Sequence, residues 1–205
     1  LGGPSFALKP AIAEGLVTGP RIYPSGAMIT ITGGHGDFRA PHELPRQIGV
    51  PPPIGGALNA SQLADSPDEV RLRVREQLLL GASQIKLTAG GGVASPHSPL
   101  DAVTFTDDEL RAAVEAASNW GTYVTVHAYT PESIQRAIAA GVKCIEHTHL
   151  MDDATAKLMA EKGIWLSSQP LPQELGNAFP PGSDNRTNFF FDDTATAEIY
   201  TLARK

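Results

Sequence analysis

Residues 67–168 alternate between short β-prone runs and helical stretches, and this rhythm constrains the fold more than any other feature. The predicted helices are 67–80, 107–120, 130–141 and 152–162. The β-prone runs that follow them are 84–88, 123–127, 143–147 and 164–168. Parallel neighbours need a crossover connection, and a helix of this length supplies one. The alternation therefore predicts an α/β fold with a parallel sheet.

Composition narrows the class of protein. The chain has 205 residues, enough for one domain with or without an appendage, and a formal net charge of -6. The excess of acidic over basic residues leaves no broad positive surface that could bind the phosphate backbone of a nucleic acid. No apolar run approaches the roughly 18 residues of a membrane-spanning helix. The single cysteine, Cys144, can form neither an internal disulfide nor a thiolate metal cluster. We expect small molecules or dipeptides as partners, not nucleic acid or membrane, and an oligomer is possible.

Polar residues at the ends of three β-prone runs distinguish a barrel from an open sheet. Lys86, His127 and His147 each fall at or near the carboxyl end of a run, where the strands of a (β/α)8 barrel build their site. His127 and His147 are one β-α repeat apart. Two neutral imidazoles suit zinc, whereas a lysine has a donor to offer only after conversion to a carbamate. Alternatively, Lys86 is a solvated charge and the histidines are core imidazoles.

The same residues belong to longer motifs. The segments 85–93, Val126-His127-Ala128-Tyr129 and Ile145-Glu146-His147 together resemble the amidohydrolase superfamily, in its branch of imidazolonepropionase-like amidohydrolases and Xaa-Pro dipeptidases. Residues 19–37 resemble the third strand of that family and the loop after it. The resemblance covers roughly residues 5–170 and implies a partial (β/α)8 TIM barrel containing strands three to seven of eight.

The resemblance also implies a metal site and a reaction. Lys86, carbamylated by carbon dioxide, would bridge two divalent metals, expected to be zinc, and His127 and His147 would bind one of them. No catalytic residue is identified, because the family's general-base aspartate is expected on an eighth strand and its His-x-His pair on a first strand. The implied reaction is hydrolysis of an amide or peptide-like C–N bond, in a dipeptide or N-acyl amino acid, by a metal-activated water. By itself the chain is expected to be inactive.

Three further residues are candidates for substrate binding. Tyr129 lies two residues beyond His127, and His35 and Arg39 could bind a substrate carboxylate or simply close a turn. Residues 90–92 could form a phosphate cradle, although they lack the lysine and hydroxyl of a Walker loop, so a room-making turn fits them better. A metal-free phosphate-binding barrel enzyme and a non-catalytic barrel fragment therefore remain the alternative functions.

The ends of the chain have their own expectations. The sequence begins at Leu1 without a signal-peptide pattern and is interpreted as part of a longer chain, with the cytoplasm favoured. We expect a partial barrel domain over 1–188. Residues 189–205 break the β-α rhythm and resemble the translation of a sequencing-library adapter, so they are expected to be a non-native tail from an environmental assembly.

Overall fold

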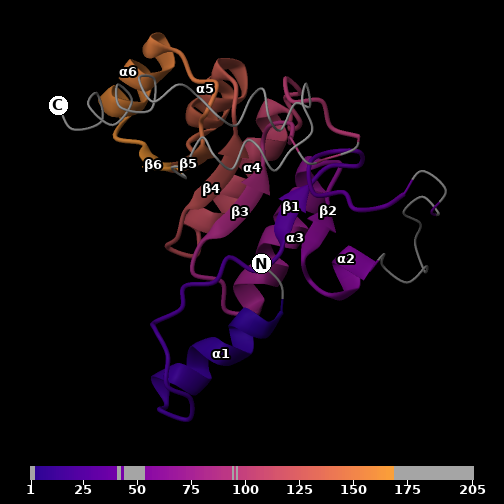
Figure 1. Cartoon of the computed structure of the whole chain (residues 1–205), viewed down its shortest axis with the longest axis vertical. Coiled ribbons are helices and arrows are strands. Elements are labelled where there is room, and N and C mark those ends of the chain that lie inside the picture. Colours follow the sequence, from indigo (N-terminus) through magenta and orange to yellow (C-terminus); the bar gives the residue numbers. More distant parts are fainter. Residues whose placement is uncertain (1–2, 41–42, 44–53, 94, 96, 169–205) are drawn as a thin grey trace, which may run out of the picture.

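The computed structural model describes residues 3–40, 43, 54–93, 95 and 97–168, which form a parallel sheet with helices packed on one face (Figure 1). The strand order is β2-β1-β3-β4-β5-β6. The strands are β1 (Met28–Thr30), β2 (Ser61–Leu63), β3 (Ile85–Thr88), β4 (Val124–Ala128), β5 (Cys144–His147) and β6 (Trp165–Ser167). The helices are α1 (Pro4–Ala13), α2 (Ile54–Ala57), α3 (Pro67–Leu79), α4 (Asp107–Ser118), α5 (Pro131–Ala140) and α6 (Asp153–Lys162).

Helices α3 to α6 begin where their sequences place a capping side chain. The Oγ atoms of Ser66, Thr106 and Thr130, and a carboxylate oxygen of Asp152, accept hydrogen bonds from backbone N–H groups in the first turn. Thr106 and Glu109 form the reciprocal capping box. A cap of this kind typically contributes about 1 kcal/mol of stability. The four predicted helices and the strands between them are confirmed, with boundaries differing by one or two residues.

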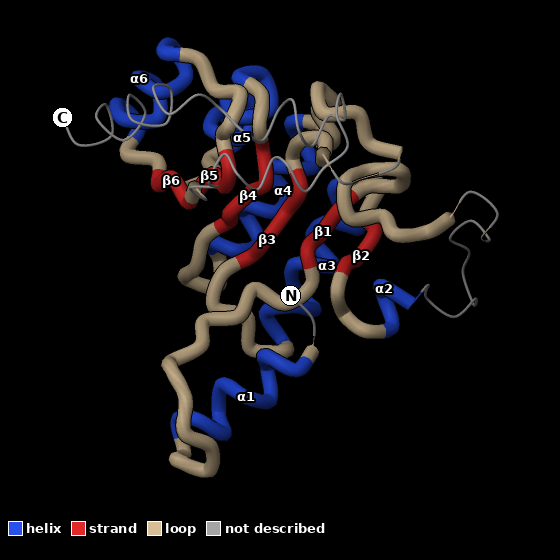
Figure 2. The backbone as a smooth tube through the Cα atoms, in the orientation of Figure 1, coloured by secondary structure: helices blue, strands red, loops and turns tan. Residues whose placement is uncertain are grey.

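The core lies between the sheet and helices α3 to α5, which lie behind the strands in Figure 2. Alternate strand residues point toward these helices and are fully buried, for example Ile85 and Leu87 in β3 and Val124 and Val126 in β4. Because strand side chains alternate between faces, Lys86, between Ile85 and Leu87, points to the opposite face. The sheet therefore separates an apolar layer from a polar one.

The N-terminal third contains elements that periodicity does not predict. Strands β1 and β2 have three residues each, too few for an alternation to stand out. β1 falls within 19–37, where the resemblance places a third barrel strand. β2 adds an unexpected strand, pairing in parallel with β1 along the edge away from β3.

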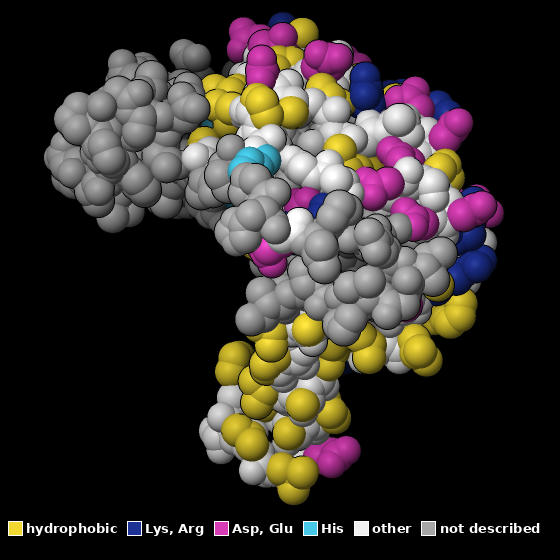
Figure 3. Space-filling model, turned by 90° about the vertical axis from the view of Figure 1, so that its right-hand side faces the viewer, with side chains coloured by type: hydrophobic (Ala, Val, Ile, Leu, Met, Phe, Trp, Pro, Cys, Tyr) yellow, Lys and Arg dark blue, Asp and Glu magenta, His cyan; other side chains and the backbone are white. Residues whose placement is uncertain are grey.

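Helix α1 projects from the sheet as an arm with no buried residue (Figure 1). Hydrophobic side chains gather on this arm in Figure 3, and Leu8 is 42% exposed. The ammonium of Lys9 ties the helix to the turn before β3, donating to the Gly81 carbonyl (3.2 Å) and to Oγ of Ser83 (3.1 Å).

The described strands form an open part of a barrel, so the predicted fold class, a partial (β/α)8 barrel, is confirmed. Helices long and apolar enough to cross a membrane are absent from the described residues. The tail predicted over 189–205 and most of the proline-rich stretch 41–53 lie outside the described part of the chain.

Candidate active site

The carboxyl ends of β3, β4 and β5 bring Lys86, His127 and His147 to one end of the sheet. Thr88, His127 and Glu146 stand side by side across these strands, so Lys86 lies two residues deeper than the level of His127. The imidazole rings of His127 and His147 meet edge to face with centroids 4.7 Å apart. Lys86 and His127 are 8% and 3% exposed. Both side chains are therefore held in a largely water-excluded site.

His147 reaches this site through an unusual backbone conformation. Strand alternation would place neighbouring Glu146 and His147 on opposite faces of β5. The chain leaves the extended conformation here, with φ of +75° at His147 and +58° at Thr148. Left-handed conformations are uncommon outside glycine and costly for a β-branched residue. The turn brings the His147 imidazole to the same side as His127.

Lys86 is paired with Glu146, a partner that our sequence analysis did not assign. Its ammonium donates to Oε2 of Glu146, and Oγ1 of Thr125 donates to Oε1 (3.0 Å). Burial lowers the pKa of Lys86, and the Glu146 carboxylate opposes this by favouring the ammonium. Buried lysines usually have an acidic neighbour. Glu146, which lies on the same strand face as Cys144, two residues earlier, was the residue in the sequence that could have indicated this pair.

His127 is neutral and has a defined tautomer. Burial, followed by the neighbouring His35, lowers its pKa from 6.5 to about 2. Its Nε2 lies 2.7 Å from the carbonyl oxygen of Gly91. Because a carbonyl can only accept, Nε2 carries the proton and Nδ1 carries the lone pair.

The glycine-rich loop after β3 packs tightly around the histidines. A Cβ built on Gly92 would lie 1.9 Å from Nδ1 of His35, and one on Gly91 would lie 1.6 Å from the carbonyl oxygen of Pro99. Neither position accepts a larger residue without movement. The glycines thus let the loop backbone approach the rings closely, as expected of a tight turn that leaves room for the site.

Two of the predicted substrate-binding residues belong to this cluster of rings. The His35 ring stacks on His127 with centroids 4.3 Å apart, and the Tyr129 ring meets His127 edge-on at 4.6 Å. Burial raises the pKa of the Tyr129 phenol, which keeps it protonated. His149, in the turn beyond β5, extends the cluster, its ring centroid 5.9 Å from that of Tyr129.

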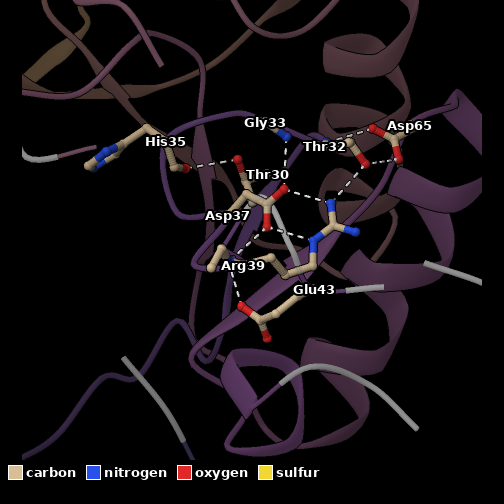
Figure 4. A network of polar contacts seen from close by, with 9 residues as sticks. Thr30, Thr32, Gly33, His35, Asp37, Arg39, Glu43 and Asp65 are labelled. Carbon is tan, nitrogen blue, oxygen red and sulfur yellow. Dashed lines mark hydrogen bonds and ion pairs between the residues drawn. The ribbon is translucent and has the colours of Figure 1, made fainter. Parts of the chain in front are cut away.

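Arg39, the third candidate, is directed to a carboxylate of its own loop (Figure 4). Its Nε and Nη2 donate to the two oxygens of Asp37 at 2.8 Å and 2.6 Å. Burial raises the pKa of Asp37, but hydrogen bonds from Arg39 and from the Gly33 N–H outweigh it and hold the pKa below its ordinary value. This ion pair occupies the Nε and Nη2 edge of the guanidinium.

Comparison with known proteins identifies the family. The model of the amidohydrolase family matches residues 4–185, most of the chain. The chain belongs to the amidohydrolase family. The resemblance on which the sequence analysis relied is confirmed.

Individual members share both sequence and fold with this amidohydrolase chain. Ochratoxinase from Aspergillus niger is 39% identical over 168 residues, which are 80% of this chain and 35% of that protein. A crystal structure of an amidohydrolase matches 99% of the chain with a TM-score of 0.81 and 39% identity, using 50% of its own length. A prolidase complexed with N-methylphosphonate-L-proline matches 99% at a TM-score of 0.77 and 37% identity, over 48% of its length. The chain thus spans about a third to a half of these relatives.

Amidohydrolases generally depend on metals, so the residues must be tested for their ability to hold one. In the described part of the chain, no three His, Cys, Asp or Glu side chains are already arranged around a metal position. The donor types nevertheless fit, because two imidazoles and a buried lysine converge from neighbouring strands. To bind a metal, Lys86 would have to give up its hydrogen bond to Glu146. If Nε2 of His127 were the metal-binding atom, it would have to give up its hydrogen bond to the Gly91 carbonyl.

Proposed function

We propose that the chain is the central part of a metal-dependent amidohydrolase that cleaves an amide or peptide-like C–N bond in a dipeptide or N-acyl amino acid. The observation that carries this proposal is the convergence of Lys86, His127 and His147 at the carboxyl ends of three adjacent parallel strands. This is the end at which barrel enzymes build their active sites.

Each of these residues has a chemical role in the proposal. Lys86, as a carbamate, would bridge two divalent metals, and the imidazoles of His127 and His147 would bind one of them; zinc suits such donors. The chemistry that the metals supply when bound is activation of water and polarisation of the amide carbonyl. Burial keeps His127 neutral, and so able to donate an electron pair, at any ordinary pH.

The substrate would meet the rim of rings above this centre. The phenol of Tyr129 remains protonated, so it can donate a hydrogen bond to a carboxylate or carbonyl oxygen. The His35 imidazole, stacked on His127, belongs to the same cluster of rings. The names of the related prolidase and amidohydrolase support substrates with an amide or peptide-like bond.

Zinc binding tests the donors without requiring turnover. The chain is purified with bicarbonate, and zinc binding is measured by calorimetry for the parent and for Lys86→Ala, His127→Asn and His147→Asn. Each variant should lose zinc affinity, whereas the exposed His97→Gln should match the parent. Propionate should restore part of the affinity of Lys86→Ala. Unchanged binding by Lys86→Ala would contradict the bridging carbamate.

Ligand protection separates this proposal from its alternatives. Zinc should raise the thermal unfolding midpoint of the parent chain, because binding to the folded state stabilises it. Protection by phosphate alone would favour a phosphate-binding barrel, and protection by neither would favour a non-catalytic fragment. Hydrolysis is assayed with Xaa-Pro dipeptides and N-acyl amino acids on the longer protein encoded by the source gene.

A further inference from the structure

The loop that follows β1 carries His35 and is closed by hydrogen bonds within itself. The Gly34 N–H donates to the Ile31 carbonyl and the Asp37 N–H to the Gly34 carbonyl, both at 3.0 Å. Oγ1 of Thr30, at the end of β1, donates to the carbonyl of His35 (2.8 Å). These bonds fix the backbone of His35 but leave its ring to be placed by the rest of the loop.

The buried carboxylate of Asp37 accepts hydrogen bonds from both sides of this loop (Figure 4). Asp37, 7% exposed, accepts from the Gly33 N–H at 2.8 Å and from the Arg39 N–H at 3.2 Å. The Nε and Nη2 of Arg39 supply two more hydrogen bonds. Four hydrogen bonds fill the lone pairs of a carboxylate. Asp37 therefore has no electron pair left for a metal or a substrate, although it lies two residues from a histidine of the site.

Arg39 connects this closure to the helix layer. Its Nη2 lies 3.4 Å from Oγ1 of Thr32. The N–H and Oγ1 of Thr32 donate to the two oxygens of Asp65, at 2.7 Å and 2.8 Å. The Asp65 N–H in turn donates to Oε2 of Glu69 in the first turn of α3 (2.8 Å). Both ends of the loop, Thr32 next to β1 and Arg39 beyond His35, are thus connected to the start of α3 through Asp65.

We propose that the Asp37–Arg39 ion pair positions His35: it holds the imidazole stacked on His127, and Arg39 itself does not meet the substrate. The Asp37 carboxylate, held by Arg39, closes the loop across His35 by accepting from the Gly33 N–H, and the opposite wall is the backbone of Gly92, which leaves no room for the ring to retreat. The importance of His35 for catalysis rests on the proposed function, whereas its placement does not.

The placement can be read in the metal-free chain by nuclear magnetic resonance. Histidine ring signals are assigned with His35→Gln and His127→Gln, and the nuclear Overhauser contact between the two rings is measured. Arg39→Met removes the ion pair at nearly constant side-chain length, and Asp37→Asn removes the charge without changing volume. Arg111→Met is the matched control, because Arg111 pairs with Asp107 and Asp108 on the surface of α4.

The expected result is loss of the ring-to-ring contact, and of its ring-current shift, in Arg39→Met and Asp37→Asn, with both retained in Arg111→Met. Arg39→Lys should restore part of the signal, because an ammonium can replace one of the two hydrogen bonds. If Arg39→Met does not fold, Asp37→Asn decides alone. A folded Asp37→Asn with an unchanged contact overturns the proposal. Because no metal or turnover is involved, this result is independent of zinc binding.

Discussion

The imidazole rings of His35 and His127 stack with centroids 4.3 Å apart and planes inclined by 23°, although one follows β1 and the other lies in β4. Strand β3 lies between β1 and β4 in the sheet, so the two side chains meet above it. The contact links the loop after β1 to a proposed metal ligand. A substitution that moves one of the two rings should therefore change the position of the other.

Gly92→Ala should push His35 away from His127. The new Cβ would lie 1.9 Å from the ring, which must move, and overpacking of this kind costs about 1–3 kcal/mol. Gly91→Ala should cost more, because its obstacle is the backbone carbonyl of Pro99. Urea unfolding measures both, with Gly3→Ala, at an open position, as the control. Equal stability of Gly92→Ala and the parent would show that the ring is loosely held.

Stability should fall in acid because of His127. Its pKa is about 2 in the folded chain and ordinarily 6.5, so between these values the unfolded chain binds a proton that the folded chain does not. The free energy of unfolding therefore decreases as pH falls below about 6.5. Urea titrations at several pH values should show a shallower slope for His127→Gln. The slope for His97→Gln, at an exposed position, should match the parent; a parent-like slope for His127→Gln would contradict this origin.

The Lys86–Glu146 pair should behave as a buried unit. Glu146→Gln leaves the buried Lys86 ammonium without its counter-charge; because the Glu146 side chain is 26% exposed, the cost should lie at the low end of the range for buried pairs, about 3 kcal/mol. The double variant Lys86→Met, Glu146→Gln should lose less stability than the sum of the two single variants. Unfolding free energies of all four proteins give the coupling energy. Strict additivity would mean that the two charges do not depend on each other.

Relief of backbone strain should be measurable at Thr148. Thr148→Gly should be more stable than Thr148→Ala by about 1 kcal/mol, because both variants lose the buried side chain and the hydrogen bond from Oγ1 to the His147 carbonyl, but only glycine adopts φ of +58° without strain. Asn59→Gly, at φ of +52°, is the control and should change stability less, because asparagine tolerates this conformation. Equal stability of Thr148→Gly and Thr148→Ala would show that this backbone conformation stores no strain.

Periodicity and capping residues predicted the second half of the fold because the signals there are local. Thr106 with Glu109, and Thr130 with Pro131, mark helix starts through groups only a few residues apart. β2 has no such signal, since its three residues are defined by pairing with β1 across more than thirty residues of sequence. Short elements that depend on distant partners cannot be read from local pattern.

The candidate site divides in the same way. The positions of Lys86 and His127 could be predicted from the ends of their strands, because in a β-strand the position of a residue in the sequence determines its depth along the strand and the face of the sheet on which it lies. The Lys86–Glu146 pair and the Asp37–Arg39 pair depend on side-chain directions that spacing does not specify. His147 was located on the correct strand, but only the left-handed backbone at its position explains which face it serves.

That backbone turn also determines how the site could be moved to another protein. β3 and β4 contribute through ordinary strand geometry, so His127 could be introduced into a foreign barrel as a single substitution, whereas the buried Lys86 would need its partner Glu146 as well. Residues 146–149 would have to be transferred together, because the His147 imidazole reaches the same side of the sheet as its neighbour Glu146 only when the left-handed bend of the backbone is transferred too. A graft that transferred His147 without Thr148 would turn the imidazole toward the recipient's helices.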